Sequence, residues 1–561
     1  MAYLKTCSDP TAQQNLTHLS RETVLKDPRS ARIVGACALL ASIGCGGRPD
    51  AWDARFTAGV DPQGNQQVAG LEGSVAVLDP GLNQVMMLTS PERHQLVVQR
   101  LPVGRDVVRF VSSPSRDRLF VLSRGVQPRL RSDDEAPQLL VFDGGVAPEQ
   151  IGQYTLQDPY EQLEIDPAGE WLIIHGSEGL VSNPNELILV QQGRNSQLSK
   201  TLDSYGGKPV RFTFTGELSV PGESARRLLV VQREKDLAII DLADPDAPEI
   251  TVGLPEKASG GFASPQAVAY HDAVGGIPAM LAVQLAGDSN VYLLTIGPSN
   301  SPEHALSLDA NLVDVGGVPS TIDFVQTQKD GGLRLAALVP SKSAAVLIEP
   351  GSSMTLEVKL PQPFDKIRRI TDDVSESSGQ DIALLYGQTN TIAFWQLGTT
   401  TGTPYRSVDA YDISIKVDSV LDIPGGVFPD RKILAGASTS ASQQFYVLDL
   451  SERKSFPLDV LKNLTLNLSP DGERLWAYDS GAMGFAQLTF DPLQPTSLYT
   501  EKPIHFVHDF ATSKADARSA IALHILSNGD GNTLDATLFD GLEPSSSDTR
   551  FFDALELEGI K

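Results

Sequence analysis

Short apolar runs, separated by turn-forming residues, recur along most of the chain. The runs are rich in Val, Ile, Leu and Phe, and clusters of Gly, Pro, Asp, Asn and Ser divide them. Long stretches with the period of an amphipathic helix are scarce. Runs of this composition, bounded by such clusters, are typical of β-strands joined by turns. The pattern therefore predicts an all-β protein.

One kind of apolar run, closed by an acidic or turn residue, returns ten times. The copies begin at Ser74, Gln138, Glu186, Asp236, Asn290, Ala344, Thr391, Gln444, Gly484 and Leu534. Most successive copies start 46 to 64 residues apart. This spacing leaves room for four strands per unit, which is the size of one blade of a β-propeller. A single blade cannot bury both of its faces, whereas blades packed around an axis cover one another.

Two further elements recur within these units. The segments "SPSRDRLFVLS" (Ser113–Ser123), "DPAGEWLIIHG" (Asp166–Gly176) and "SPDGERLWAYD" (Ser469–Asp479) begin with a short polar residue and proline. Proline favours the second position of a turn, and Ser or Asp before it accepts a hydrogen bond from the turn. A glycine-led loop precedes a strand in segments 103–110, 206–212 and 316–324. We therefore expect each unit to run from glycine loop to inner strand, turn, second strand, third strand and outer strand.

The segment "LPVGRDVVRFVSSPSRDRLFVLSRG", followed by "PQLLVFDGG", resembles the YVTN-type β-propeller repeat, which is related to the lactonase-like seven-bladed propellers. The resemblance extends from Leu101 to Gly193 and returns at Leu464–Asp491. Val107 stands where the repeat has proline, and Arg116 where it has glycine. WD40-like and TolB-like propellers share the Ser-Pro-Asp-Gly turn. The resemblance therefore implies a fold rather than a function, since propellers host many activities.

The number of blades and the domain limits follow from the same count. Ten copies exceed the usual four to eight blades. Some copies could belong to insertions, the ring could be unusually large, or the chain could form two units. We predict one propeller of four-stranded antiparallel blades over residues 68–561, with seven or eight blades favoured and up to ten as the alternative. Residues 46–67 would be a tether and the entry to the first blade.

The stretch "RIVGACALLASIGCGGRPD" near the N-terminus contains an uncharged run from Ile33 to Gly44. The run is too short to cross a bilayer as a helix, which needs about 20 apolar residues. Basic residues precede it, and small residues lead from it into Cys45. This order is typical of a secretory signal, and its end resembles a bacterial lipobox, whose cysteine receives lipid. A buried helix with a chance Gly-Cys end is the alternative.

The resemblance to a lipobox predicts that residues 1–45 are a lipoprotein signal segment and that Cys45 carries the lipid. Gly46 follows the cysteine, in place of the Asp that retains many lipoproteins at the inner membrane. We therefore expect a protein of the cell envelope, anchored to the outer membrane and facing the periplasm or the surface. Cys7 and Cys37 are the other cysteines, and both precede Cys45. The mature chain would then have no thiol for a disulfide or a cysteine metal site.

A formal charge of -25 limits the classes of molecule that the chain can bind. Such a chain is repelled by nucleic acid and by anionic lipid headgroups. We expect envelope proteins or a small ligand as partners, no nucleic acid, and a membrane contact through the N-terminal lipid only.

Candidate metal ligands are few. The segment "SNGDGNTLD" places Asn528, Asp530 and Asn532 at alternate positions, with Asp535 beyond them. Closely spaced oxygen ligands suit calcium, although the distal Glu of an EF-hand is missing. Asn-Gly and Asp-Gly also form ordinary tight turns. His505 and His508 lie three apart and would face opposite sides of a strand. We predict no catalytic residues and no cofactor, and a calcium ion bound at this loop is the alternative to an ordinary turn.

These observations favour a lipid-anchored binding or scaffolding module without enzymatic activity. The alternative is a propeller enzyme, such as a lactonase-like hydrolase or a dehydrogenase, with its site in the central channel. That enzyme would need Glu, Asp, Asn or His side chains converging at one mouth of the channel.

Overall fold

The computed structural model describes residues 68–397, apart from gaps at 81, 90–96, 195, 257–259, 275, 302–303, 328–331, 352–353 and 371–381. Beyond residue 397 it describes the strands, together with Lys416 and Val417. By internal contacts the chain divides into two units, Met1–Arg55 with Glu556–Glu558, and Phe56–Leu555 with Gly559–Lys561. All described residues belong to the second unit.

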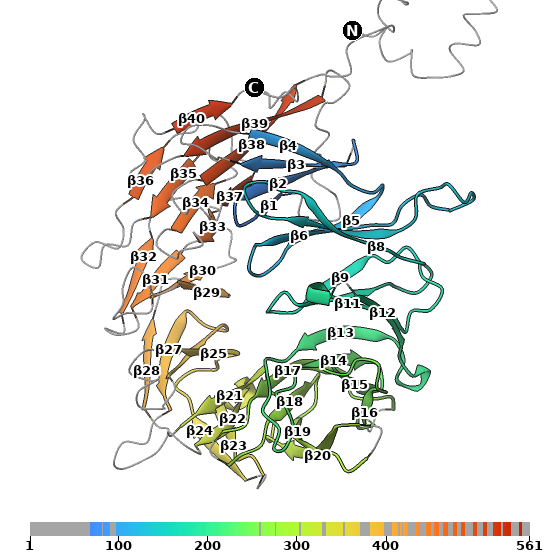
Figure 1. Ribbon diagram of the computed structural model, residues 1–561. Helices are drawn as coiled ribbons and strands as arrows, with labels where there is room; N and C mark the ends of the chain where they lie inside the picture. The colour runs from blue at the N-terminus through green and yellow to red at the C-terminus, as the bar shows by residue number, and fades with distance from the viewer. Residues whose placement is uncertain are drawn as a thin grey trace, which may run out of the picture. The chain divides into compact units, whose positions relative to one another are not determined.

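The described residues form ten four-stranded sheets, each built from four strands that are consecutive in sequence. We number them in chain order, from sheet 1 (β1–β4, blue in Figure 1) to sheet 10 (β37–β40, red). All neighbouring strands within a sheet pair antiparallel. Repeated four-stranded antiparallel sheets of this kind are the blades of a β-propeller, so the predicted fold class is confirmed.

Sheets 1 to 5 consist of β1 (Val68–Gly70), β2 (Ser74–Asp79), β3 (Gln84–Thr89), β4 (Val97–Pro102), β5 (Val107–Ser112), β6 (Arg118–Ser123), β7 (Gln138–Asp143), β8 (Gln150–Thr155), β9 (Gln162–Ile165), β10 (Trp171–His175), β11 (Glu186–Gln191), β12 (Ser196–Thr201), β13 (Pro209–Phe214), β14 (Leu228–Arg233), β15 (Asp236–Asp241), β16 (Ile250–Gly253), β17 (Pro265–His271), β18 (Met280–Leu285), β19 (Asn290–Pro298) and β20 (Leu306–Asp314).

Sheets 6 to 10 consist of β21 (Thr321–Gln326), β22 (Leu333–Val339), β23 (Ala344–Ile348), β24 (Thr355–Lys359), β25 (Lys366–Ile370), β26 (Ile382–Tyr386), β27 (Thr391–Gln396), β28 (Ser407–Asp412), β29 (Ser419–Ile423), β30 (Ile433–Ala437), β31 (Phe445–Asp449), β32 (Lys454–Leu458), β33 (Leu464–Leu468), β34 (Leu475–Asp479), β35 (Gly484–Leu488), β36 (Leu498–Glu501), β37 (Asp509–Thr512), β38 (Ala520–Asn528), β39 (Gly531–Phe539) and β40 (Thr549–Phe552). Three short 3-10 helices are η2 (Gln192–Arg194), η3 (Ser204–Gly206) and η4 (Pro340–Lys342). None of the described helices is long and apolar enough to cross a membrane.

The number of blades corrects the favoured prediction of seven or eight. Every copy of the recurring apolar run belongs to a sheet of its own, so ten sheets form and no copy lies in an inserted loop. The larger number, kept as the alternative, is the one observed. The prediction failed because sequence spacing does not distinguish a long loop from an additional sheet.

The recurring run forms the third strand in sheets 2 to 10, as predicted. Its first copy differs, because Ser74–Asp79 is β2, the second strand of sheet 1, and Gln84–Thr89 (β3) is the third. The residues of both strands are almost all buried. A strand buried on both faces reads as a continuous apolar run, so the pattern alone could not tell the second strand from the third.

Apolar clusters fill the spaces between consecutive sheets. In β14, Leu229 and Val231 pack against sheet 3, whereas Leu228 and Val230 pack against sheet 5. This alternation follows from the two-residue period of a strand, which sends successive side chains to opposite faces. Equivalent clusters lie between each pair of consecutive sheets from sheet 1 to sheet 7.

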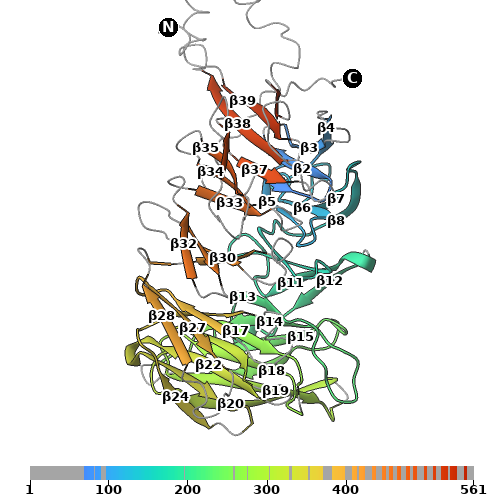
Figure 2. The ribbon, with the colours of Figure 1, turned by 90° about the vertical axis from the view of Figure 1, so that its left-hand side faces the viewer.

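The first strands of neighbouring sheets lie beside one another. β1 contacts β5, β5 contacts β9, and β21 lies between β17 and β25. β1 also contacts β37, the first strand of the last sheet, and Figures 1 and 2 both place β37 beside sheet 1. The first strand is therefore the inner strand of its sheet, and the last sheet meets the first.

Each antiparallel sheet has two ends. The loops between its first and second strands and between its third and fourth strands lie at one end, which we call the turn end. The loop between the second and third strands and the connections to neighbouring sheets lie at the other, which we call the connection end. The two ends differ in what their polar side chains do.

Candidate functional site

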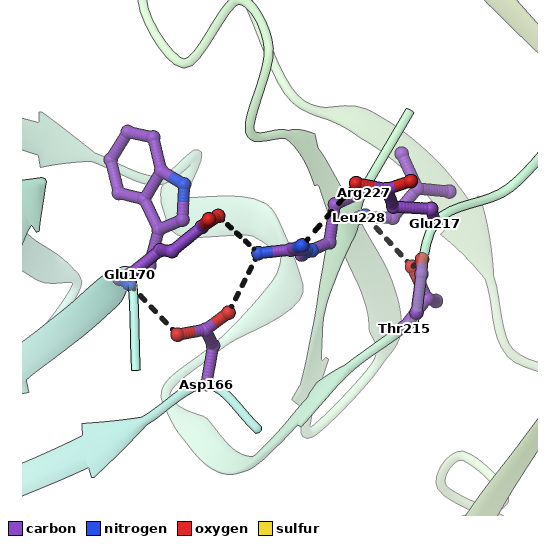
Figure 3. Close-up of polar contacts among 8 residues, drawn as sticks. Asp166, Glu170, Thr215, Glu217, Arg227 and Leu228 are labelled. Atoms are coloured by element: carbon purple, nitrogen blue, oxygen red, sulfur yellow. Dashed lines mark hydrogen bonds and ion pairs between the residues drawn. The ribbon is translucent and has the colours of Figure 1, made fainter. Parts of the chain in front are cut away.

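The turn ends of sheets 3 and 4 are joined by a cluster of charged side chains around Arg227 (Figure 3). The Arg227 guanidinium lies 2.9 Å from Asp166 Oδ2 and 2.6 Å from Glu170 Oε2, both in the turn of sheet 3. Glu217 Oε1 is 3.7 Å away on the other side. Asp166 is fully buried, and its second oxygen accepts the Trp171 N–H at 2.8 Å. Both oxygens of this carboxylate are therefore engaged in joining and shaping the two sheets.

The buried polar residue before each turn has the same role in three successive sheets. The N–H of the first residue of the second strand donates to Ser113 Oγ in sheet 2 (3.1 Å), to Asp166 in sheet 3 and to Thr215 Oγ1 in sheet 4 (2.9 Å). Ser113 and Asp166 were predicted to accept such a bond, and the structure confirms this. Thr215 was missed, because a longer loop follows it in place of the Ser-Pro motif.

Backbone bonds also join neighbouring turn ends. The N–H of Gly73 in sheet 1 donates to the Gly144 carbonyl of sheet 2 at 2.7 Å. A Cβ on Gly73 would lie 2.5 Å from the Val146 nitrogen, so this close approach requires glycine. The turn ends of the first four sheets thus hold the sheets together.

Ser219, His271 and Asp272 lie near each other where sheets 4 and 5 meet. Ser219 Oγ donates to Asp272 Oδ2 at 3.0 Å, and His271 Nδ1 lies 2.6 Å from the Asp272 carbonyl oxygen. In an acyl-transfer triad the imidazole stands between the hydroxyl and the carboxylate. Here the Asp272 carboxylate contacts the Ser219 hydroxyl directly, and the His271 ring contacts a backbone carbonyl instead of the serine. Asp272 therefore holds the loop that contains Ser219 against sheet 5.

The connection ends of sheets 2 to 4 carry longer loops that are held in place by carboxylates. In the loop between β6 and β7, Asp134 Oδ2 accepts the N–H groups of Leu130 (2.9 Å) and Arg131 (2.8 Å). Glu135 Oε1 accepts the Arg105 N–H at 3.1 Å. This loop is therefore tied both to itself and to the connection that enters sheet 2.

The neighbouring loops of sheet 3 are braced in the same way. Asp158 accepts the Ser182 N–H at 2.7 Å and the Ser182 hydroxyl at 3.1 Å. Lys208, in the connection to sheet 4, forms an ion pair with Glu178 of sheet 3. Their hydrogen bond raises the pKa of the Lys208 ammonium, so this contact holds a charged lysine between the two loops.

A buried ion pair fixes the connection that enters sheet 4. Arg233 is fully buried, and its guanidinium lies 2.5 Å from Asp236 Oδ1 and 2.7 Å from Oδ2. Arg233 also donates to the carbonyl of Asp203. Asp203 Oδ1 accepts the Tyr205 N–H at 2.8 Å and begins η3. This arrangement fixes the backbone of η3 while the Tyr205 ring faces solvent.

Some of the most exposed large apolar side chains lie at these connection ends. We define the loop surface as residues 124–137, 156–161, 176–185, 202–210 and 233–236. It carries Leu130, Val210 and Tyr205, which are 82%, 68% and 67% exposed, and Leu180. A surface of exposed apolar groups on braced loops is an arrangement suited to binding, since apolar patches beside polar groups are typical of interaction sites.

Sequence reasoning did not identify the loop surface. The segment "VQPRLRSDDEAP" (126–137) lies between two predicted strands and belongs to none of the recurring motifs. Its length and the Arg-Leu-Arg sequence at its tip were the available signals. The bracing by Asp134, Asp158 and Asp203 could not be read from sequence, because their partners come from the folded loops.

The sequence-predicted site residues are only partly described. Cys45, Asp530, His505 and His508 lie outside the described residues. Asn528 ends β38, and Asn532 and Asp535 belong to β39, where Asn528 is opposite Gly531 and Asp535 is opposite His524. The calcium site and the lipid on Cys45 therefore stay predictions. Across the ranges that the structure describes, no group of three or more His, Cys, Asp or Glu side chains could hold a metal ion.

Comparisons with known proteins add three structural likenesses. No protein-family profile and no curated protein matches the chain. The dihydro-heme d1 dehydrogenase NirN matches at 11% identity with a TM-score of 0.40, over 72% of this chain and 76% of that one. A eukaryotic initiation factor matches at 10% identity with a TM-score of 0.41, over 82% and 94%. Hsv2 of Kluyveromyces lactis matches at 8% identity with a TM-score of 0.33, over 63% and 97%. Similarity at this level carries no conclusion about what this chain binds or does.

Proposed function

We propose that the protein is a binding or scaffolding module that holds a partner on its loop surface. The observation that carries the proposal is the pairing of exposed apolar side chains with loops whose backbone is already fixed. Leu130 and Tyr205 are both exposed, and both lie on backbone that a carboxylate holds. Binding costs less when the contact loops are ordered beforehand.

The exposed apolar side chains at the connection ends of sheets 2 to 4 support this proposal. At the turn ends, Asp166, Arg227 and Glu170 join neighbouring sheets through ion pairs. At the connection ends of sheets 2 to 4, the large apolar side chains face solvent. An exposed apolar group does not stabilise a monomer, so this placement favours contact with another molecule.

The anchoring inferred from the sequence belongs to the same proposal. A lipid on Cys45 would tether the propeller to the outer membrane, and the repeat would be of the YVTN type. The substitution Cys45→Ser should move the protein from the membrane fraction to the soluble fraction. A variant that stays in the membrane fraction would contradict the lipid anchor. That result would not bear on the proposal that the loop surface binds a partner.

No observation on the described residues favours the alternative that the protein is an enzyme. The Ser219, His271 and Asp272 group has its serine on the carboxylate, and the charged side chains around Arg227 are paired with one another.

The proposal is tested by comparing two triple variants in the native cells. One variant carries Leu130→Ser, Tyr205→Ser and Val210→Ser on the loop surface. The matched control carries Val146→Ser, Ile151→Ser and Leu356→Ser, which remove exposed apolar side chains elsewhere. The mild-detergent extract is separated by size. The wild type and the control should migrate in a larger complex, and the loop-surface variant as the single chain. Equal migration of the two variants would refute the proposal.

A further inference from the structure

The outer strand of sheet 5 is longer than that of any other described sheet. β20 has nine residues, and the other outer strands have four to six. It pairs with β19 along its whole length without a shift of register. Among the strands that the structure describes, none pairs with its other side. The outer edge of sheet 5 is therefore the longest that these sheets present.

β20 also lacks the usual protection of an edge strand. An edge strand presents backbone N–H and C=O groups to any strand that approaches it, and proteins block this approach with Lys, Pro, a bulge or a short strand. The sequence of β20, Leu-Ser-Leu-Asp-Ala-Asn-Leu-Val-Asp, has neither Lys nor Pro. By contrast, β24 carries Lys359, β4 ends in Pro102, and β8 pairs with β7 through a register shift. β20 is thus open to pairing with a further strand.

One face of β20 is apolar and only partly covered. Leu306 and Leu308 pack in the cluster between sheets 4 and 5. Ala310 and Leu312 continue on the same face, because the side chains of a strand alternate between its two faces. Both are exposed, Leu312 by 42%. β16, the outer strand of sheet 4, has four residues, so sheet 4 leaves the end of this face uncovered.

The sequence of β20 is complementary to itself when two copies run antiparallel. Ala310 is the central residue of the nine, so full overlap places the two Ala310 residues opposite each other on a two-fold axis. Leu308 then faces Leu312 of the second copy, and Asp309 faces Asn311 of the second copy. Apolar cross-strand pairs stabilise a sheet, whereas like charges directly opposite destabilise it. A shift of the axis to Asp309 would oppose two carboxylates, so the sequence favours the register about Ala310.

We propose that β20 pairs antiparallel with β20 of a second copy of this chain, so that two copies of sheet 5 form one continuous sheet about Ala310. The contact is isologous, since the same strand serves on both sides. β20 lies outside the loop surface, so this inference goes beyond the proposed function. A strand from a different protein could add to the same edge. The second copy is favoured because the chain's own sequence supplies both the facing leucines and a neutral residue opposite each Asp.

The pairing should be weak and should strengthen with salt. Contact along one strand buries less than the roughly 1,200 Å² typical of stable interfaces, so dilution in a cell extract separates the two copies. Each chain carries a formal charge of -25, and the two chains repel each other. Salt screens this repulsion beyond about 8 Å at ~0.15 M, while the apolar pairs and backbone hydrogen bonds remain. A contact held by opposite charges would instead weaken with salt.

Sedimentation velocity of the purified full chain measures the association. At roughly micromolar and higher concentrations the wild type should form a reversible dimer, with more dimer in ~0.5 M than in ~0.05 M salt. Leu312→Lys places a charge opposite Leu308 of the second copy and should raise the dissociation constant at least about tenfold. The matched control Leu356→Lys makes the same change on the outer strand β24, at a side chain that is 47% exposed. This control should dimerise like the wild type.

A cysteine crosslink tests the register. Opposite Cα atoms of an antiparallel pair lie about 4.5 to 5.5 Å apart, which is within reach of a disulfide, so Ala310→Cys should form a covalent dimer on oxidation. Ser307→Cys should not, because it lies three residues from the axis and the two thiols would be about 20 Å apart. The wild type, with Cys7, Cys37 and Cys45, gives the background from native thiols. Because Ala310 is exposed, the new cysteine should leave the fold intact.

Each contrary result overturns the inference. A chain that stays monomeric at every concentration, a dimer that weakens with salt, a dimer that Leu312→Lys leaves intact, or equal crosslinking from Ala310→Cys and Ser307→Cys would exclude pairing about Ala310. A crosslink from Ala310→Cys to a different protein in the native cells, without a self-crosslink, would assign the edge to a foreign strand. The loop-surface variants leave β20 unchanged, so failure of the proposed function and failure of this pairing are separate results.

Discussion

At the residue scale, the junction of sheets 3 and 4 depends on one buried carboxylate. Asp166 holds Arg227 of the next sheet and the Trp171 N–H of its own turn. Removing one member of a buried charge pair leaves the other without its partner, which costs much more than removing an exposed pair.

Asp166→Ala should therefore lower the free energy of unfolding by about 3 kcal/mol or more. Glu170→Ala, which removes a mostly exposed partner of the same arginine, should cost less than about 1 kcal/mol. Urea unfolding of both variants measures the difference. Equal losses would show that burial of Asp166 does not decide its contribution.

The turn residue Arg116 adopts a backbone conformation that favours glycine. Its φ is 63°, and Gly169 at the matching position of sheet 3 has a φ of 72°. Arg116 stands where the YVTN-type repeat has glycine. The backbone at Arg116 nevertheless keeps the conformation that favours glycine. Arg116 also interacts with other groups of the protein, so the strain and these interactions act in opposite directions.

A pair of substitutions separates the two effects. Arg116→Ala and Arg116→Gly remove the same contacts, but only glycine relieves the positive φ. We expect Arg116→Gly to be more stable than Arg116→Ala by about 1 kcal/mol. Thermal unfolding of the two variants measures this difference, and a less stable glycine variant would contradict the strain.

Asp272 gives the molecule a pH dependence. Burial alone would raise the pKa of Asp272, but hydrogen bonds from Ser219 and Ala273 outweigh it and hold the pKa below its ordinary value of 3.8. Folding therefore favours the charged form. The resulting stabilisation is complete above the pKa of the unfolded chain, and it is lost as the pH falls through the lower pKa of the folded chain.

Stability should consequently decrease as the pH falls below about 4, and Asp272→Asn should reduce the slope of this decrease. Urea midpoints measured at several pH values give both slopes. An unchanged slope in the variant would mean that Asp272 contributes nothing to the acid sensitivity.

At the element scale, η3 depends on close packing between a glycine and a buried ion pair. A Cβ on Gly206 would lie 2.2 Å from the Arg233 guanidinium carbon and 2.3 Å from Asp236 Oδ1. Neither atom belongs to a flexible chain end, because both are fixed in the pair.

Gly206→Ala should therefore displace Arg233 and lower the free energy of unfolding by about 3 kcal/mol, as breaking a buried pair does. Gly193→Ala, where a Cβ would meet nothing within 4 Å, should stay within about 0.5 kcal/mol of the wild type. Denaturant unfolding compares them. A neutral Gly206→Ala would show that the pair relaxes without cost.

Elements were also the level at which sequence reasoning succeeded best. The apolar runs predicted strands because their spacing and their bounding turn residues are local properties. The assignment failed for Ser74–Asp79, since β2 and β3 are both buried on two faces. The loop surface lay beyond such reasoning: Asp158 braces Ser182 across a connection that only the folded sheets bring together.

At the scale of the whole molecule, the described strands form ten sheets, and exposed apolar side chains lie at the connection ends of sheets 2 to 4. Their turn ends carry the charged pairs that join sheets. The loop surface places the proposed partner on one defined part of a propeller whose net charge is strongly negative.

The most direct test of the binding surface is photo-crosslinking from single positions in the native cells. A photoreactive residue is placed at Val210 on the loop surface or at Val146, which is also exposed but lies at a turn end. We predict a discrete crosslinked species from Val210 that is absent from Val146. A crosslinked species from Val146 alone, or no discrete species from Val210, would contradict the central claim that the loop surface holds the partner.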